Sequence, residues 1–250
     1  MDKLLGLLAV IALALVPGQA AIAQQTQGNG VPVEFFACHW QDGKGMDDLK
    51  KVGEAFSAWA DKNDSGYSAW ILTPQFHSGV DFDIGWLGAW PDGKSMGKSI
   101  DTWLSGGGEL AADFAKVMNC GSHEMATSMR LNVPKGPPGN GLVMFSQCSM
   151  AEGKMLADAI SAHQKVAAMM AEMGSKHSSW VFYPGPGAGD IDFDYWQVLA
   201  FNNYAEFGAG YDMYMNGGGM KKAMGAMKNI SNCKRAVVFD AHLVRAGASN

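Results

Sequence analysis

Apolar and polar positions along the chain form blocks that predict strands and helices. Residues 33–40 are almost continuously apolar and rich in aromatic side chains, which is typical of a buried strand. The apolar side chains that follow recur at the spacing of one helix face, with charged residues between them: Leu49, Val52, Phe56 and Trp59. This pattern predicts an amphipathic helix after the first strand.

The pattern of the next 70 or so positions adds two strands, a second helical region and a last strand. The strands are predicted at residues 67–73, 82–90 and 123–132. The helical region spans 95–118, and three consecutive glycines at 106–108 interrupt it. Because glycine costs about 1 kcal/mol inside a helix, we expect two helices with a kink between them. The predicted order is β-α-β-β-α-β.

The second half of the chain repeats this plan. Trp70 and Trp180 are 110 positions apart, and the two Gly-Gly-Gly segments, 106–108 and 217–219, are 111 apart. The last cysteines of the two halves are 113 apart. An offset that drifts by only three residues predicts two copies of one module. Strands are predicted in the second copy at residues 142–149, 178–183, 193–201 and 236–244, with helical regions around 159–173 and 204–227.

The domain organisation follows from these blocks and from the two ends. Residues 1–23 have an apolar run and a small-residue cleavage site, which predicts a signal peptide. A flexible lead, 24–32, precedes module 1 at 33–132. A Pro/Gly linker, 133–141, separates it from module 2 at 142–247. We therefore expect an exported protein, periplasmic or extracellular, with no stable membrane anchor after cleavage.

Composition narrows the class of protein. Only 17% of the residues are charged and 48% are hydrophobic, which is typical of a globular chain. The formal net charge is −5 and no basic run occurs, so nucleic acid is not an expected partner. No G-K-[ST] follows the glycine triplets, which excludes a phosphate-binding loop of that type. No cofactor is predicted.

Four cysteines in an exported chain favour disulfides over a metal site, because neither C-x-x-C nor histidine spacing accompanies them. Four cysteines allow three pairings. The pairing that keeps each module self-contained is Cys38–Cys120 and Cys148–Cys233. In a ferredoxin-like β-α-β-β-α-β unit the fourth strand begins beside the end of the first, which brings these positions within disulfide reach.

Two such modules in tandem resemble the dimeric α/β-barrel superfamily, in which two ferredoxin-like units join through their sheets and enclose a pocket. The predicted fold class is α+β, with both modules forming one intramolecular barrel. The resemblance implies relatives such as cofactor-free monooxygenases, haem-degrading enzymes, chlorite dismutase-like proteins and stress-responsive barrel proteins. It rests on topology and repeat pattern, and no catalytic motif matches, so no functional residue is carried over.

The strand alternation divides the third strand of each module into two faces. We expect the face rich in aromatics to line the barrel interior, and the face with Leu87 and Ala89 to pack under helices. The expected ligand-binding residues are Trp86, Trp90, Tyr195, Gln197, Phe201 and, from the fifth strand, Gln147. A filled, dry barrel core is the structural alternative for the same residues.

Among polar residues, His39 is a weak candidate for an acid or base on the pocket wall. His163 lies beside an apolar helix stripe, which is typical of a buried structural histidine rather than a haem ligand. The repeated Asp-Phe-Asp segments at 81–83 and 192–194 are expected to form a strand-end polar cluster or to cap a neighbouring helix. No metal site is predicted.

The sequence leaves three functions open. The first is binding of a small apolar or aromatic molecule between the sheets. The second is a cofactor-free, monooxygenase-like enzyme using His39. The third is a stress-related or structural protein without a ligand. The chain is expected to be a monomer or a homodimer.

Overall fold

The structure is a computed structural model that describes residues 30–132 and 136–247. The predicted signal peptide, most of the predicted lead and the first three residues of the predicted linker lie outside these ranges.

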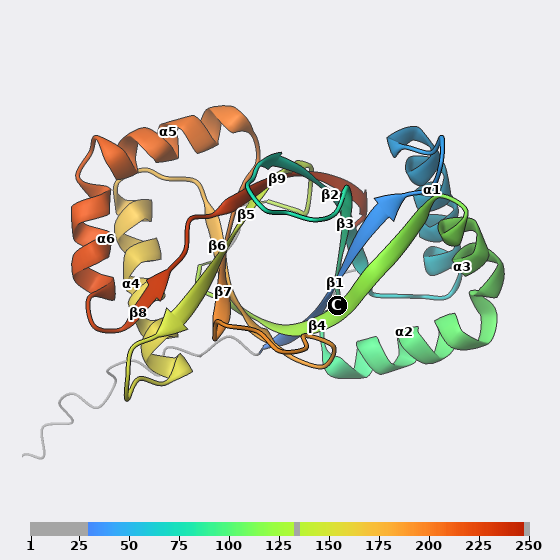
Figure 1. Cartoon of the computed structure of the whole chain (residues 1–250), viewed down its shortest axis with the longest axis horizontal. Coiled ribbons are helices and arrows are strands. Elements are labelled where there is room, and N and C mark those ends of the chain that lie inside the picture. The colour runs from blue at the N-terminus through green and yellow to red at the C-terminus, as the bar shows by residue number, and fades with distance from the viewer. Residues whose placement is uncertain (1–29, 133–135, 248–250) are drawn as a thin grey trace, which may run out of the picture.

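The chain folds into two β-α-β-β-α-β units, each with its second helical region divided in two (Figure 1). Module 1 contains β1 (Val31–Trp40), α1 (Met46–Lys62), β2 (Ser68–Phe76), β3 (Ile84–Ala89), α2 (Gly93–Gly106), α3 (Gly108–Ala115) and β4 (Met118–Arg130). Module 2 contains β5 (Gly141–Met150), α4 (Leu156–Glu172), β6 (Ser178–Pro184), β7 (Tyr195–Phe201), α5 (Tyr204–Met215), α6 (Gly219–Met227), β8 (Ser231–Cys233) and β9 (Val237–Arg245). The predicted α+β fold class is confirmed.

The helix breaks fall at the glycine triplets. In module 1, α2 ends at Gly106 and α3 begins at Gly108, with Gly107 between them. In module 2, Gly218 precedes α6 with a φ of 83°, a conformation that glycine adopts without strain. The predicted pair of kinked helices is therefore present in each module.

The strands form one closed sheet. Within each module the strands follow the ferredoxin-like order, β4-β1-β3-β2 in module 1 and β9-β5-β7-β6 in module 2. The first and third strands of each module are central, and its second and fourth strands lie at the outside. The modules join where β4 pairs with β6 and where β2 pairs with β9, both antiparallel. These junctions close a ring with α1–α3 outside one half and α4–α6 outside the other (Figure 1). The barrel therefore closes within a single chain.

Several strand boundaries differ from the prediction, most of all at the last strand of each module. β4 begins at Met118 instead of residue 123, because it continues to pair with β1 as far as Trp40, across a register shift at Ala37/Cys38. In module 2 the same region is divided into β8 and β9. The polar residues around Asn119 and Gly121 conceal this early part of the strand in the sequence.

Both predicted disulfides are present. Cys38 pairs with Cys120 across β1 and β4, and Cys148 pairs with Cys233 across β5 and β8, with Cα–Cα distances of 3.8 and 3.9 Å. Two disulfides are typical of proteins from oxidising compartments. Within the described ranges, every helix is too short or too polar to cross a bilayer.

The apolar core is divided by the sheet into an inner and two outer layers. The barrel interior holds a cluster that includes Val33, Leu72, Val143, Phe182, Val198 and Phe239. Outside the barrel, module 1 packs an aromatic-rich cluster against its helices, and module 2 packs smaller clusters against its own. The candidate site lies in the outer layer of module 1.

Candidate functional site

The face assignment made from the sequence is wrong for β3. Ile84 and Trp86 pack with the helices of module 1, whereas Leu87 and Ala89 join the cluster inside the barrel. Strict alternation would put Phe82 on the same face as Ile84 and Trp86, but Phe82 precedes the strand and packs inside the barrel. Because the chain between Phe82 and Ile84 is not extended β-structure, the parity changes before β3 begins.

The same inversion holds in module 2. Tyr195 packs with α4 residues, and Phe201 contacts Phe207 of α5. Alternation along β7 places Gln197 on this outer face too. Tyr195, Gln197 and Phe201 line neither of the two cavities described below.

A cavity of about 570 Å³ lies between the sheet of module 1 and its three helices. We call it the helix-side cavity. Most of its wall is aromatic or aliphatic: Phe36, Phe56, Trp59, Tyr67, Trp86, Trp90, Ile100, Trp103, Leu104, Phe114 and Met118. The aromatic rings meet mainly edge to face, as between Phe56 and Trp86, whose centroids are 5.6 Å apart. Thus Trp86 and Trp90 do line a cavity, but on the opposite side of the sheet from the predicted one.

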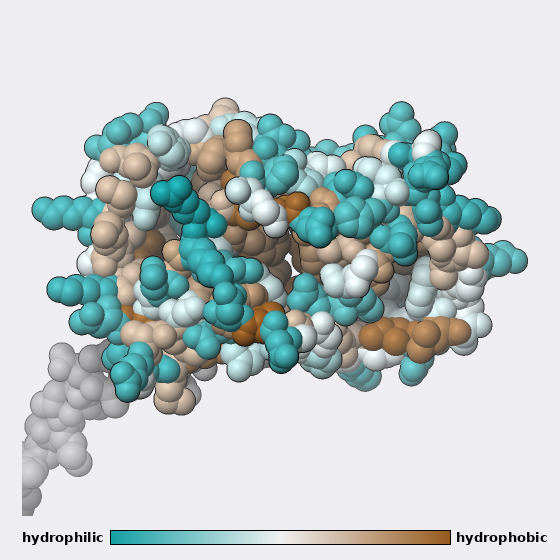
Figure 2. All heavy atoms as spheres, in the orientation of Figure 1, coloured by the Kyte–Doolittle hydropathy of each residue, from teal (hydrophilic) through white to brown (hydrophobic). Residues whose placement is uncertain are grey.

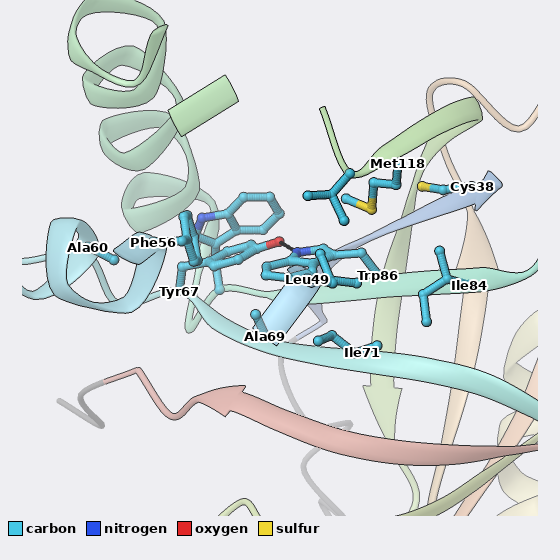
Figure 3. Packing of buried hydrophobic residues seen from close by; sticks show 12 residues of the cluster. Cys38, Leu49, Phe56, Ala60, Tyr67, Ala69, Ile71, Ile84, Trp86 and Met118 are labelled. Atoms are coloured by element: carbon cyan, nitrogen blue, oxygen red, sulfur yellow. Dashed lines mark hydrogen bonds between the residues drawn. The ribbon is translucent and has the colours of Figure 1, made fainter. Parts of the chain in front are cut away.

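A continuous chain of hydrogen bonds crosses the sheet side of this cavity. Trp86 Nε1 donates to the Tyr67 hydroxyl at 2.8 Å, and that hydroxyl donates to Glu34 Oε1 at 2.5 Å. Figure 3 shows Tyr67 and Trp86 meeting beside Phe56 of α1. The other carboxyl oxygen of Glu34 lies 2.7 Å from His123 Nε2. This hydrogen-bond chain therefore runs from the buried indole of Trp86 to His123 at the surface.

The solvent-facing end of this hydrogen-bond chain is positioned by the pairing of β1 with β4. Glu34 and Phe36 are two residues apart on β1, so both point to the helix side, and Phe36 is paired with His123 of β4. The His123 ring stacks on Phe36 at a centroid distance of 3.7 Å and an interplanar angle of 10°. The Glu34 side chain is only 12% exposed, whereas that of His123 is 52% exposed. Glu34 and His123, which we call the Glu34–His123 dyad, thus link solvent to the cavity wall.

Burial fixes the protonation state of Tyr67. Desolvation, and next the neighbouring Glu34 carboxyl, raise the pKa of the Tyr67 hydroxyl well above its usual value. Tyr67 therefore stays a neutral phenol and remains the donor to Glu34.

Gly88 of β3 makes room for this phenol. A Cβ atom at Gly88 would lie 1.9 Å from the Tyr67 hydroxyl oxygen. No larger residue fits at this position while Tyr67 keeps its place, so the glycine is part of the site.

A second cavity, of about 460 Å³, lies inside the barrel, and we call it the barrel cavity. Five phenylalanines contribute to its wall: Phe35, Phe82, Phe145, Phe182 and Phe239. Its polar lining includes Gln147 and Glu124, the latter half-buried with its pKa raised by desolvation. Lys234 donates to Gln147 and to Asp192 at 3.1 Å. Viewed along the barrel, the surface shows a narrow central hollow with apolar residues around it (Figure 2).

The other predicted polar candidates have local roles. His39 lines neither cavity; its side chain is 53% exposed, with Nδ1 3.3 Å from Asp83 Oδ2. Asp83 accepts from Trp40 N, and Asp194 accepts from Met150 N, so each caps a strand end as expected. The suggestion that His39 serves as the pocket acid or base is therefore not supported by its position.

His163 is the buried histidine that the helix pattern predicts. It is 2% exposed, and its Nε2 lies 2.9 Å from the Tyr195 hydroxyl. Desolvation lowers its pKa to about 4, so the imidazole is neutral near pH 7. It faces neither of the two cavities.

Sequence reasoning missed Glu34, Tyr67 and His123. Glu34 carries the signal that could have revealed the site, because it is the single charged residue within the apolar block 33–40. A carboxylate in a buried strand needs a hydrogen-bond donor, which points to a polar partner on a neighbouring strand. That this partner is His123 follows only from the strand register.

No protein-family model matches the chain, and no curated protein sequence does. Solved structures are nevertheless similar. An anthrone oxidase-like protein matches with a TM-score of 0.53 at 12% identity, covering 87% of this chain and 93% of that one. A provisionally assigned monooxygenase from Lactobacillus acidophilus matches with a TM-score of 0.55 at 7% identity, covering 88% and 97%.

A provisionally assigned chlorite dismutase matches with a TM-score of 0.52 at 11% identity, covering 87% of this chain and 96% of that one. At these identities the likeness establishes the fold alone. The chain has the dimeric α/β-barrel fold, in its intramolecular form, and its specific family is not identified.

Proposed function

We propose that this protein binds a small, largely aromatic molecule in the helix-side cavity of module 1. The observation that carries the proposal is the composition of the wall, an aromatic enclosure with one hydrogen-bonded polar chain along one side. Ligand sites combine an apolar lining with a few fixed polar groups in this way, and their volumes fall in the same range.

The barrel cavity is the other possible location and corresponds to the pocket between the sheets that the sequence predicts. Two cationic residues line it, Lys234 and Arg235, and Lys234 already donates to Asp192 and Gln147, so the Lys234 group is less available to a ligand. The helix-side cavity is larger and has a wider aromatic wall. We therefore place the ligand there, in contact with the predicted residues Trp86 and Trp90.

Native mass spectrometry of the mature protein, compared with a denatured sample, tests for a bound molecule and gives the oligomeric state. Anthrone is a suitable probe, since one structural neighbour is an anthrone oxidase-like protein. Its binding should quench the tryptophan fluorescence of the cavity wall.

Two matched variants locate the probe. Trp103→Ala removes an aromatic wall from the helix-side cavity, and Phe82→Ala removes one from the barrel cavity. We expect Trp103→Ala to weaken anthrone binding at least tenfold and Phe82→Ala to have little effect. The reverse result would place the ligand inside the barrel. Absence of binding in every variant would favour the structural or stress-related role.

A second candidate function is cofactor-free oxygenation at the same cavity. It is favoured by the Glu34–His123 dyad, which could remove a proton from a bound aromatic ketone and pass it to solvent. Anthrone and one O₂ would give anthraquinone and one water. Glu34→Gln should then abolish turnover while anthrone affinity is retained, and His39→Ala should change neither. Turnover that survives in Glu34→Gln would exclude this mechanism.

We also propose that the chain is exported, as residues 1–23 predict and as two disulfides support. Expression in a host that exports the protein should yield a mature chain beginning at Gln24. A chain that retains Met1 would exclude cleavage at this site.

A further inference from the structure

Among the residues that the structure describes, a histidine lies against the second disulfide but not in the same way against the first. The Sγ atoms of Cys148 and Cys233 and one ring nitrogen of His163 all lie within 4.8 Å of one another. His163 is on α4, and the matching position on α1, 110 residues earlier, is Gly53. The two disulfides therefore have different chemical surroundings.

The polar groups around His163 are also specific to module 2. Its Nε2 bonds to the Tyr195 hydroxyl, which lies 2.6 Å from Ser231 Oγ. By strand register, Tyr195 corresponds to Ile84 and Ser231 to Met118 of module 1. The whole His-Tyr-Ser chain thus stands beside one disulfide only.

One nitrogen of this histidine has no protein partner. In the part of the chain that the structure describes, His163 Nδ1 is buried and makes no hydrogen bond. Buried polar atoms are normally paired, so an unpaired nitrogen on an imidazole ring that lies against two sulfurs needs an explanation. A histidine whose second nitrogen is held by a hydrogen bond is the usual arrangement of a metal-ligating histidine.

We propose that Cys148, Cys233 and His163 form a binding site for one zinc-class ion when the disulfide is reduced. A dithiol reductant gives up two electrons and two protons, becoming a disulfide, and leaves two cysteine thiols. The ion then displaces both thiol protons and accepts two thiolates and the imidazole. Thiolate and imidazole are the ligands this class of metal prefers, and a three-ligand site leaves the fourth position to water.

The position of the site allows such opening. β8 has three residues and pairs only with β5, and Cys233 on it is half-buried. Reduction therefore releases a short strand at the end of the sheet, while the closed ring of eight strands keeps its pairings. In the oxidised protein the same sulfurs are bonded to each other and hold no ion.

The test uses full-length protein with only one cysteine pair in each variant, reduced by a phosphine under anaerobic conditions. Cys38→Ser/Cys120→Ser keeps the proposed site, and Cys148→Ser/Cys233→Ser keeps the pair without a histidine. Cobalt(II) is the probe, read by its thiolate charge-transfer absorption, with zinc as competitor. The first variant should bind one equivalent at least 100-fold more tightly than the second. Equal affinities would overturn the proposal.

His163→Gln in the first variant should lower cobalt affinity at least tenfold, and an unchanged affinity would also overturn it. A reduced variant that loses its far-ultraviolet circular dichroism has unfolded and cannot report on the site. In that case the second measurement uses wild-type protein. At a fixed dithiol ratio, zinc should increase alkylation-detected reduction of Cys148 and Cys233 and leave Cys38 and Cys120 unaffected. A zinc effect that is equal on both pairs, or absent from both, would exclude the site.

Discussion

The two modules share one plan, yet their helix layers differ in packing. In module 2, α6 packs against α4 through glycine: a Cβ at Gly219 would lie 3.0 Å from Met170 Sδ and 2.9 Å from Tyr214 Cα. The matching glycine of module 1, Gly108, has nothing within 4 Å of such an atom. The corresponding glycine is thus a close helix contact in module 2, whereas in module 1 it is exposed at the start of α3.

The same contrast appears on the sheet. By strand register, Glu34, Tyr67, Trp86, Gly88 and His123 correspond to Met144, His177, Gln197, Leu199 and Ala236. Each partner of the polar chain is thus changed in module 2, and the glycine that admits Tyr67 is a leucine. The difference teaches that one scaffold carries a polar hydrogen-bond chain beside a cavity in one copy and different residues at those positions in the other.

The largest expected effect comes from filling the space at Gly88. Gly88→Ala should lower the free energy of unfolding by about 3 kcal/mol, because its Cβ would overlap Tyr67 and break the hydrogen bond to Trp86. Urea denaturation followed by fluorescence measures this change. Gly97→Ala is the control, since its Cβ meets nothing in α2 and alanine favours the helix by about 1 kcal/mol. Equal stability of the two variants would contradict the packing.

Acid should destabilise module 2 through His163. Its pKa is about 4 in the folded protein and about 6.5 when unfolded, so protonation favours the unfolded chain. Above pH 6.5 His163 is neutral in both the folded and the unfolded chain, so it has no effect on the free energy of unfolding. As the pH falls from 6.5 towards 4, the unfolded chain takes up a proton first, and the folded protein loses stability. Between pH 7 and 4 this group should remove about 2 to 3 kcal/mol. His163→Phe should show a correspondingly flatter pH dependence of unfolding, and an unchanged pH dependence would contradict this assignment.

The sequence was sufficient for the order of elements, the glycine helix breaks and the cysteine pairing, because each depends on local spacing or on the repeat. It was insufficient for the faces of β3 and β7. Both faces of these strands are buried and apolar, so alternation yields two sets of residues without saying which one meets the helices. For β3, the backbone conformation between Phe82 and Ile84 decides which set meets the helices. That conformation depends on contacts with strands that are distant in the sequence.

The polar site was harder to predict for a related reason. Glu34 and His123 are 89 positions apart, and only the pairing of β1 with β4 brings them together. Such a contact leaves no periodic trace in the sequence.

The difference in helix packing can be tested by a pair of matched substitutions. Gly219→Ala should lower the free energy of unfolding by about 2 kcal/mol, since its Cβ would press on the backbone of Tyr214. Gly108→Ala should leave stability unchanged or raise it by up to about 1 kcal/mol, because its Cβ enters open space at the start of α3. Thermal unfolding of both variants measures the difference. A loss of equal size in both would contradict the difference in glycine packing between the two modules.

The smallest expected effect concerns the polar chain itself. Tyr67→Phe removes the hydroxyl that accepts from Trp86 and donates to Glu34, leaving the indole N–H buried without its partner. An unpaired buried donor costs about 1 to 2 kcal/mol, so the free energy of unfolding should fall by that amount. Tyr211→Phe is the control, because Tyr211 is 55% exposed and should show no change. In module 2 the position of Tyr67 is held by His177, whose Nδ1 lies 2.8 Å from Ser175 Oγ and not beside a strand carboxylate. The corresponding change, His177→Phe, should therefore leave Trp86 fluorescence unaltered. A shift of that fluorescence in Tyr67→Phe alone would show that the chain is a local property of module 1 and not of the shared fold.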